Sequence, residues 1–215
     1  PFGRTVEIAH SHNVPVIVDA ASMLPPIENL TRFIAAGADM VSFSGGKGVR
    51  GPQSTGILCG RRELIEAAYL NSAPHSEGIG RAAKVCKEEI AGLVAALELF
   101  IDTDFEAVTA GWLSDAQLLA DAIADIPGVR ASVTEIDPNS DEARRTHPRA
   151  MVEFDSFWNG PNYERVAQKL LDGEPSIKVS TGIFGGGISV SPVNLQPGEA
   201  ETVAHQLRVV LTSAG

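Results

Sequence analysis

A lysine and an aspartate each follow a short apolar run, in positions where chemistry is common. Lys47 lies in the turn 44–48 (SGGKG), directly after the apolar run 40–43, and Asp19 ends the apolar run 16–18. Polar side chains at the carboxyl ends of neighbouring buried strands are typical of a ligand site in an open sheet. The two residues therefore predict an active site that contains an amine and a carboxylate.

This pair has the chemistry needed to hold pyridoxal phosphate. A desolvated lysine amine forms a Schiff base with an aldehyde, and a carboxylate can face the pyridinium nitrogen. The alternatives are that Lys47 is a surface turn residue and that Asp19 caps a helix. A nucleotide phosphate loop would need glycine at 41 and serine or threonine at 48, and the chain has Val41 and Gly48, which excludes that motif.

The expected elements place both residues at one sheet edge. A strand–helix–strand order over 14–43 predicts a parallel pair joined by a right-handed crossover, and 55–60 follows as an antiparallel neighbour. Further strands are expected at 129–136, 150–154, 177–180 and 188–191, and helices at 5–12, 29–36, 63–70, around 90–101, 105–126, 163–171 and 197–213. The fold class is therefore predicted to be α/β, with a smaller α+β part at the C-terminal end.

Composition limits the possible partners. The 215 residues are 44% hydrophobic, which is enough for a sizeable core, and the net charge of −10 disfavours nucleic acid as a partner. No run of 18 apolar residues indicates a membrane span. Cys59 and Cys86 lack metal-site spacing, so we expect no metal site, and reduced thiols in a cytoplasmic protein.

Three stretches carry a resemblance to a known family. The segments 16–26 (VIVDAASMLPP), 37–53 (GADMVSFSGGKGVRGPQ) and 78–90 (GIGRAAKVCKEEI) resemble a branch of pyridoxal-phosphate enzymes. That branch includes bacterial L-seryl-tRNA selenium transferase, or selenocysteine synthase, and D-glucosaminate-6-phosphate ammonia-lyase. The similarity spans nearly the whole chain, including 194–199 (NLQPGE).

The resemblance implies the aspartate-aminotransferase fold (fold type I), usually in a homodimer or higher oligomer. It assigns the Schiff base to Lys47 and the pyridine nitrogen contact to Asp19. It also places Ser44 at the cofactor phosphate and Ser22 near the phenolic oxygen of the ring. The alternative for each serine is a plain loop residue.

Four more residues are candidate substrate contacts. Arg50 and Gln53 follow Lys47 closely and are expected to contact phosphate or substrate. His75 and Arg81 lie in the loop 71–81, which in such dimers often reaches the neighbouring subunit's site. The alternative is that these polar side chains are simply exposed.

The resemblance also implies a domain order. Residues 1–80 would be the remainder of a mainly parallel-sheet, cofactor-binding large domain, 81–126 connecting helices, and 127–215 the small C-terminal domain. The family's N-terminal segment normally brings the glycine-rich phosphate loop and the group stacked on the pyridine ring. We therefore expect N-terminal sequence to be missing from these 215 residues.

The expected activity is elimination or ammonia-lyase chemistry, or a related transfer, on a small amino acid or amino sugar acid. The alternative enzyme hypothesis is an aminotransferase or desulfurase of the same fold. The non-enzyme hypothesis is a truncated homologue that serves as an oligomerisation partner and takes up no cofactor.

Overall fold

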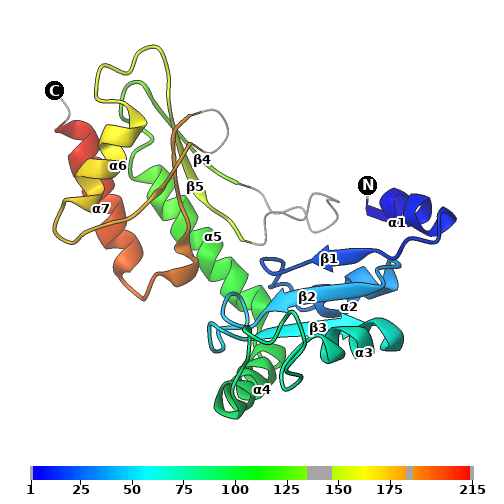
Figure 1. The fold of residues 1–215 in the computed structure, drawn as a ribbon. Coiled ribbons are helices and arrows are strands. Elements are labelled where there is room, and N and C mark those ends of the chain that lie inside the picture. The colour runs from blue at the N-terminus through cyan, green and yellow to red at the C-terminus, as the bar shows by residue number, and fades with distance from the viewer. Residues whose placement is uncertain (1, 135–146, 183–185, 214–215) are drawn as a thin grey trace. The chain divides into compact units, whose positions relative to one another are not determined.

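The computed structural model describes residues 2–134, 147–182 and 186–213. The chain divides into two compact units, one ending at Phe105 and one beginning at Glu106, and each is described by itself. Figure 1 labels the helices and the strands β1 to β5. In the first unit they are α1 (Phe2–Ser11), β1 (Ile17–Asp19), α2 (Asn29–Ala35), β2 (Met40–Ser44), β3 (Gly56–Gly60), α3 (Arg62–Leu70) and α4 (Lys87–Ile101).

The first unit is built around a three-stranded sheet in the order β1-β2-β3. β1 pairs with β2 in parallel, and β2 pairs with β3 in antiparallel, as predicted from the strand–helix–strand order. In this register Asp19 lies opposite Ser42, so β2 extends two residues beyond the end of β1. The carboxyl ends of both strands therefore lie at the same edge of the sheet.

The middle strand is held by a compact apolar core. Val41 is fully buried and Phe43 is 3% exposed, because alternate side chains of a strand point to the same face. Helix α4 packs on this core through Leu93, Leu97 and Phe100. The turn that carries Lys47 thus leaves a strand fixed by a neighbour on each side and by a helix.

Strand β1 differs from the prediction. We expected 14–18 to form a buried strand, but the strand begins at Ile17, whose side chain is 62% exposed. Among the described residues β1 has a strand neighbour only on the β2 side. The backbone amide of Val16 donates to the Asp39 carboxylate at 2.7 Å, which removes that amide from strand pairing.

Asp39 organises the opposite end of the sheet, where β1 and β2 begin. Its carboxylate is 5% exposed and accepts hydrogen bonds from Arg61 Nη1 at 2.9 Å and Val16 N at 2.7 Å. His10 Nε2 lies 2.8 Å from its Oδ2. The Arg61 hydrogen bond is the main reason that the pKa of Asp39 lies far below its usual value. This cluster ties α1, the start of β1, β2 and the start of α3 together.

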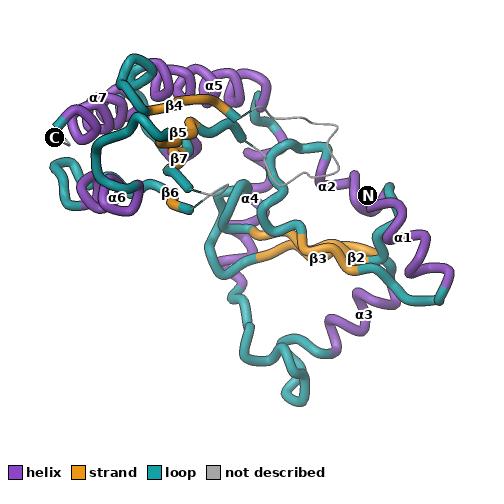
Figure 2. The backbone as a smooth tube through the Cα atoms, turned by 90° about the horizontal axis from the view of Figure 1, so that it is seen from above, coloured by secondary structure: helices purple, strands orange, loops and turns teal. Residues whose placement is uncertain are grey.

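The second unit is a four-stranded antiparallel sheet in the order β4-β5-β7-β6 with helices packed on it. Figure 2 shows it from above. Its elements are most of α5 (Phe105–Asp121), β4 (Val129–Val133), β5 (Ala150–Phe154), α6 (Tyr163–Leu171), β6 (Ser180–Thr181), β7 (Ile188–Val190), a 3₁₀ turn (Pro192–Asn194) and α7 (Glu199–Thr212). Leu119, Val166 and Leu207 are fully buried in its core, one from each helix. This matches the predicted small α+β part.

Several predicted element boundaries in this unit were wrong. The C-terminal helix begins at Glu199, not at 197, because Gly198 has a left-handed φ of 86° that a helix cannot include. Only Ser180–Thr181 pairs in the segment predicted as a strand at 177–180, and the predicted helix 105–126 ends at Asp121. Residues 135–136 of the predicted strand and most of the loop after it lie outside the described residues.

Other predictions concern features of the whole chain. In the described residues, no helix has the length and apolar character needed to cross a membrane. The same residues contain no group of three or more metal-binding side chains. Cys59 and Cys86 are both free thiols. The division into 1–80, 81–126 and 127–215 as functional domains stays a prediction.

Candidate active site

Strand order brings the predicted aspartate and lysine to the same edge of the first sheet. Asp19 is the last residue of β1, and the next amide, that of Ala20, donates to the Ser42 carbonyl at 2.8 Å. Ser44 ends β2, and Lys47 follows three residues later. In open sheets, ligands bind outside the carboxyl ends of the strands, and this is where both side chains lie.

A direct hydrogen bond links Lys47 to the loop after β1. Lys47 Nζ donates to Ser22 Oγ at 2.9 Å, and Ser22 lies three residues after Asp19. Asp19 Oδ1 accepts from the Ala21 amide at 3.0 Å, which fixes the carboxylate within its own turn. Lys47 and Asp19 are both exposed in this chain, so a ligand can reach the amine and the carboxylate.

The turn that carries Lys47 is closed by its own backbone. The Gly51 amide donates to the Gly45 carbonyl at 2.7 Å, and the Arg50 amide donates to the Lys47 carbonyl at 2.9 Å. Gln53 Nε2 donates to the Gly46 carbonyl at 2.9 Å. Gln53 was predicted to contact phosphate or substrate, and the structure places its amide on the turn itself.

The glycines of this turn are required by the protein's own packing. A Cβ on Gly48 would overlap the Leu24 carbonyl oxygen, and one on Gly46 would lie 2.6 Å from Gln53 Cα. The turn is therefore packed tightly against the loop after β1 and against the segment that leads into β3.

Gly48→Ala is expected to destabilise the first unit by about 1–3 kcal/mol, because the new methyl group must displace the backbone at Leu24. The matched control is Gly111→Ala in α5, where no atom lies within 4 Å of the added Cβ and alanine favours the helix. Urea unfolding should show a lower free energy of unfolding for Gly48→Ala and no decrease for Gly111→Ala. Equal effects would contradict the tight packing of the turn.

The remaining predicted residues are more scattered. Ser44 is half-buried opposite Gly56, and Arg50 is exposed. The His75 ring meets the Tyr69 ring edge-on at 5.0 Å, and within the described residues its Nε2 is buried without a hydrogen-bond partner. Arg81 is exposed. No hydrogen bond joins His75 or Arg81 to the Lys47–Ser22 pair in the part of the chain that the structure describes.

Two features of the site have no signal in the sequence. Arg50 has a φ of 59°, a left-handed conformation unusual for a residue other than glycine. Thr55 closes the far side of the turn, because its carbonyl accepts the Gly45 amide at 2.9 Å. Neither the backbone angle nor this contact follows from residue type or spacing.

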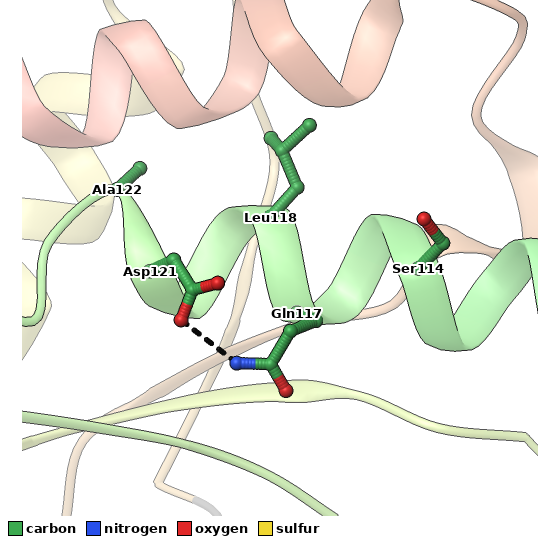
Figure 3. Close-up of a pocket in the computed structure, with 5 residues that line it drawn as sticks. All are labelled: Ser114, Gln117, Leu118, Asp121 and Ala122. Carbon is green, nitrogen blue, oxygen red and sulfur yellow. Dashed lines mark hydrogen bonds between the residues drawn. The ribbon is translucent and has the colours of Figure 1, made fainter.

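A surface hollow on the second unit offers less chemistry. It is lined by Ser114, Gln117, Leu118, Asp121 and Ala122, on α5 and the residue after it. Figure 3 shows Gln117 donating to Asp121, at 2.8 Å. The lining contains no amine, thiol or imidazole, so the edge with Lys47 is the better candidate site.

The residues at this edge fit pyridoxal phosphate. The cofactor requires an amine for its aldehyde and a carboxylate for its ring nitrogen. Asp19, at the end of β1, and Lys47, in the turn after the parallel strand β2, can supply them. The Ser22 hydroxyl lies within hydrogen-bond distance of the amine, at 2.9 Å. Lys47 and Asp19 were predicted as a pair from the sequence, and the family resemblance added Ser22.

Comparisons with known proteins agree with this fit. The profile of the L-seryl-tRNA selenium transferase family matches residues 3–126. The 5'-C-glycyluridine monooxygenase-decarboxylase of a Streptomyces species is 33% identical over 100% of this chain and 51% of its own length. The D-glucosaminate-6-phosphate ammonia lyase of Salmonella typhimurium is 35% identical over 97% of this chain and 52% of its own.

A solved structure of D-glucosaminate-6-phosphate ammonia-lyase superimposes with a TM-score of 0.68 at 31% identity, covering 100% of this chain and 53% of that one. The fold is thus that of type I pyridoxal-phosphate enzymes. The chain spans about half the length of the curated relatives that it matches. The family profile covers more than half of the chain, and the chain therefore belongs to the L-seryl-tRNA selenium transferase family of pyridoxal-phosphate-dependent enzymes.

Proposed function

We propose that the protein carrying this chain uses pyridoxal phosphate at Lys47 to act on an amino acid or an amino sugar acid. The observation that carries the proposal is the hydrogen bond from Lys47 Nζ to Ser22 Oγ, at the sheet edge where Asp19 ends the adjacent strand. Lys47 binds the cofactor aldehyde through Nζ, and Asp19 holds the proton on the ring nitrogen.

The chain's own residues then have distinct tasks. Bound pyridoxal phosphate supplies an electron sink for the α-carbon of the substrate. The Lys47 amine, when it is not bonded to the cofactor, would be the base that accepts the α-proton of the substrate. Ser22 orients that amine through its hydroxyl. Asp19 would face the ring nitrogen, with its carboxylate anchored by the Ala21 amide.

We favour elimination with release of ammonia as the reaction. The substrate loses its α-proton to Lys47 and a β-leaving group such as hydroxide, which departs with a proton as water. The resulting enamine takes up water and yields a keto acid and ammonia. The 35% identity to an ammonia lyase over 97% of the chain supports this class, and the acidic composition disfavours a tRNA-linked substrate.

Trapping of the cofactor tests the proposal. The protein, expressed from its complete gene, is incubated with pyridoxal phosphate, reduced with borohydride and digested, and the labelled peptide is identified by mass spectrometry. We expect a single label on the peptide that contains Lys47. A label on another lysine would overturn the role of Lys47. No uptake even at high cofactor concentration would overturn the whole proposal and favour a non-catalytic oligomerisation partner.

Product analysis separates the reaction classes. A lyase releases ammonia from a single substrate, whereas an aminotransferase requires an added keto acid as acceptor. A desulfurase releases the sulfur of its substrate instead, and a decarboxylase releases carbon dioxide. Ammonia release without an acceptor supports the elimination reaction. Any of the other products would replace elimination as the proposed reaction but leave the role of Lys47 unchanged.

Asp19→Asn is expected to lower turnover by about 10-fold to 100-fold, because a charged hydrogen bond to the ring nitrogen is replaced by a neutral one. The cofactor should still attach to Lys47, since the amine is unchanged. The measurement is turnover together with borohydride trapping, and Asp102→Asn at the exposed end of α4 is the control. Unchanged turnover would remove Asp19 from the proposed site.

The proposal also covers partners and location. We expect a homodimer or higher homo-oligomer in which His75 and Arg81 of the loop 71–81 approach a neighbouring subunit's site. We expect Ser44 to contact the cofactor phosphate. A cytoplasmic location accords with the two free thiols.

A further inference from the structure

The hydrogen bond from Lys47 to Ser22 depends on where the loop after β1 places Ser22. The serine lies in a tight turn, in which the Met23 amide donates to the Ala20 carbonyl at 3.0 Å. The Ala20 amide in turn donates to the Ser42 carbonyl of β2 at 2.8 Å. These bonds fix the start of the turn on the sheet, and they leave the Met23 carbonyl, at its other end, for another partner.

That partner is a buried asparagine. Asn29 is the first residue of α2 and is 2% exposed, and its Nδ2 donates to the Met23 carbonyl at 2.6 Å. Helix α2 is itself anchored, because Leu30 and Phe33 pack against the core of the first unit. Asn29 therefore transfers the fixed position of α2 to the residue next to Ser22.

The Asn29 amide has a partner on one side only. In the part of the chain that the structure describes, its Oδ1 is buried and accepts no hydrogen bond. A buried acceptor without a donor destabilises a fold by at least as much as a typical hydrogen bond stabilises it. The bond to Met23 and the unpaired oxygen thus largely cancel in free energy. The effect of Asn29 that remains is geometric, because its amide holds the Met23 carbonyl in one place.

The same loop also packs against the turn after β2. The Leu24 carbonyl lies so close to Gly48 that a Cβ on this glycine would overlap the carbonyl oxygen. Three consecutive residues, 22–24, therefore each have a partner outside the loop. Met23 is the middle one, so its bond to Asn29 controls how the serine before it and the leucine after it meet the turn that carries the lysine.

We propose that Asn29 is a positioning residue of the candidate active site. Through the Met23 carbonyl it holds Ser22 where the serine hydroxyl accepts the hydrogen bond from Lys47. It thereby sets the position of the amine that bonds the cofactor, and it acts only through Ser22. The inference rests on the proposed function, because it takes Lys47 as the residue that bonds the aldehyde.

A double-mutant cycle with Ser22 tests this role in the protein expressed from its complete gene. Asn29→Leu keeps the side-chain volume and removes both the donor to Met23 and the unpaired oxygen, so it should unfold at a temperature close to that of the wild type. We expect it to bind pyridoxal phosphate about 3-fold to 10-fold more weakly, as Ser22→Ala does. In the Ser22→Ala background, Asn29→Leu should weaken binding by less than about twofold further, because the contact that it positions is already absent.

Two more variants separate position from stability. Asn29→Ala leaves space around the Met23 carbonyl, and it should show the same coupling to Ser22 at a lower unfolding temperature. Asn162→Ala is the matched control, because it removes the hydrogen bond from the Arg165 amide that caps α6 in the second unit. This control should also unfold at a lower temperature, but its affinity for pyridoxal phosphate should equal that of the wild type.

Acetylation of Lys47 in the cofactor-free protein gives a second readout. The rate of modification by acetic anhydride is followed by mass spectrometry of the peptide that contains Lys47. Ser22→Ala should change this rate by about 2-fold to 10-fold, because it removes the hydrogen bond to the amine. Asn29→Leu should change it in the same direction and by a similar factor, and the double variant should match the single variants.

Equal effects of Asn29→Leu in the wild-type and Ser22→Ala backgrounds would make Asn29 a general support of the fold and overturn the inference. Wild-type affinity and acetylation rate in either single variant would overturn it as well, since Asn29 is proposed to act through Ser22. If the proposed function fails instead, the wild type takes up no cofactor. The acetylation rates then still test the link from Asn29 to Lys47.

Discussion

Lys47→Ala is expected to abolish covalent attachment of pyridoxal phosphate and to lower turnover by about 10³-fold or more. The variant lacks both the amine that bonds the aldehyde and the base that takes the α-proton, and a positioned general base alone contributes about 10²–10⁴-fold. The variant should fold normally, because Lys47 is exposed and, within the described residues, its side-chain hydrogen bond is to Ser22. The measurements are the visible absorbance of bound cofactor and the rate of product formation.

Matched variants show whether the effect belongs to this amine. Lys84→Ala removes an exposed lysine from the same unit and should change neither absorbance nor rate. Lys47→Arg keeps the positive charge but not a nucleophilic amine, and should be as inactive as Lys47→Ala. Ethylamine added to Lys47→Ala should restore part of the lost rate by replacing the missing base. Full activity in Lys47→Ala would remove Lys47 from the chemistry.

The placement of Lys47 and Asp19 could be predicted because it depends on local patterns. Two apolar runs separated by a helix-length segment form a parallel pair, and residues just beyond both runs must then share a sheet edge. The structure has this pairing, with Asp19 opposite Ser42. The Lys47–Ser22 contact follows from the same strand order. The roles of Arg50 and Gln53 were harder to predict, because they depend on backbone angles and contacts within the turn.

What could not be predicted depends on contacts between distant segments. Asp39 lies 29 residues from His10 and 22 from Arg61, and no spacing rule links these three side chains. The exposure of Ile17 depends on which strands flank β1, and a β-branched run reads the same at an edge as in the middle of a sheet. The late start of α7 depends on the left-handed φ of Gly198, which its sequence allows but does not require.

The two ends of the first sheet carry different polar groups. At the carboxyl ends, Asp19 and Lys47 are exposed, with hydrogen bonds only to residues of their own turns and of the neighbouring loop. At the opposite ends, Asp39 is buried and fully engaged. The groups that stabilise the sheet and the groups proposed for chemistry thus lie at opposite ends of the strands. Substitutions at Asp39 should therefore change stability but leave the groups at Lys47 in place, and substitutions at Lys47 should change activity but leave stability largely unchanged.

Asp39→Asn is therefore expected to destabilise the first unit by about 2–4 kcal/mol while leaving the groups at Lys47 in place. The buried carboxylate accepts from Arg61 and Val16 and contacts His10, and an amide nitrogen in its place turns one acceptor into a donor facing other donors. The measurement is the free energy of unfolding in urea at pH 7. Asp102→Asn, at an exposed helix end, is the control and should change little.

The stabilisation by Asp39 should depend on pH in a defined direction. Because the pKa of Asp39 is lowered in the folded protein, chiefly by the Arg61 hydrogen bond, the carboxylate stabilises the fold above the unfolded-state pKa of about 4. That stabilisation decreases as the pH falls below about 4 towards the folded-state pKa, since protonation then favours the unfolded chain. The difference in unfolding free energy between wild type and Asp39→Asn should therefore be constant near neutral pH and shrink in acid. A difference that does not change with pH would mean that the charge of Asp39 does not stabilise the fold, and that the loss in the variant comes from packing alone.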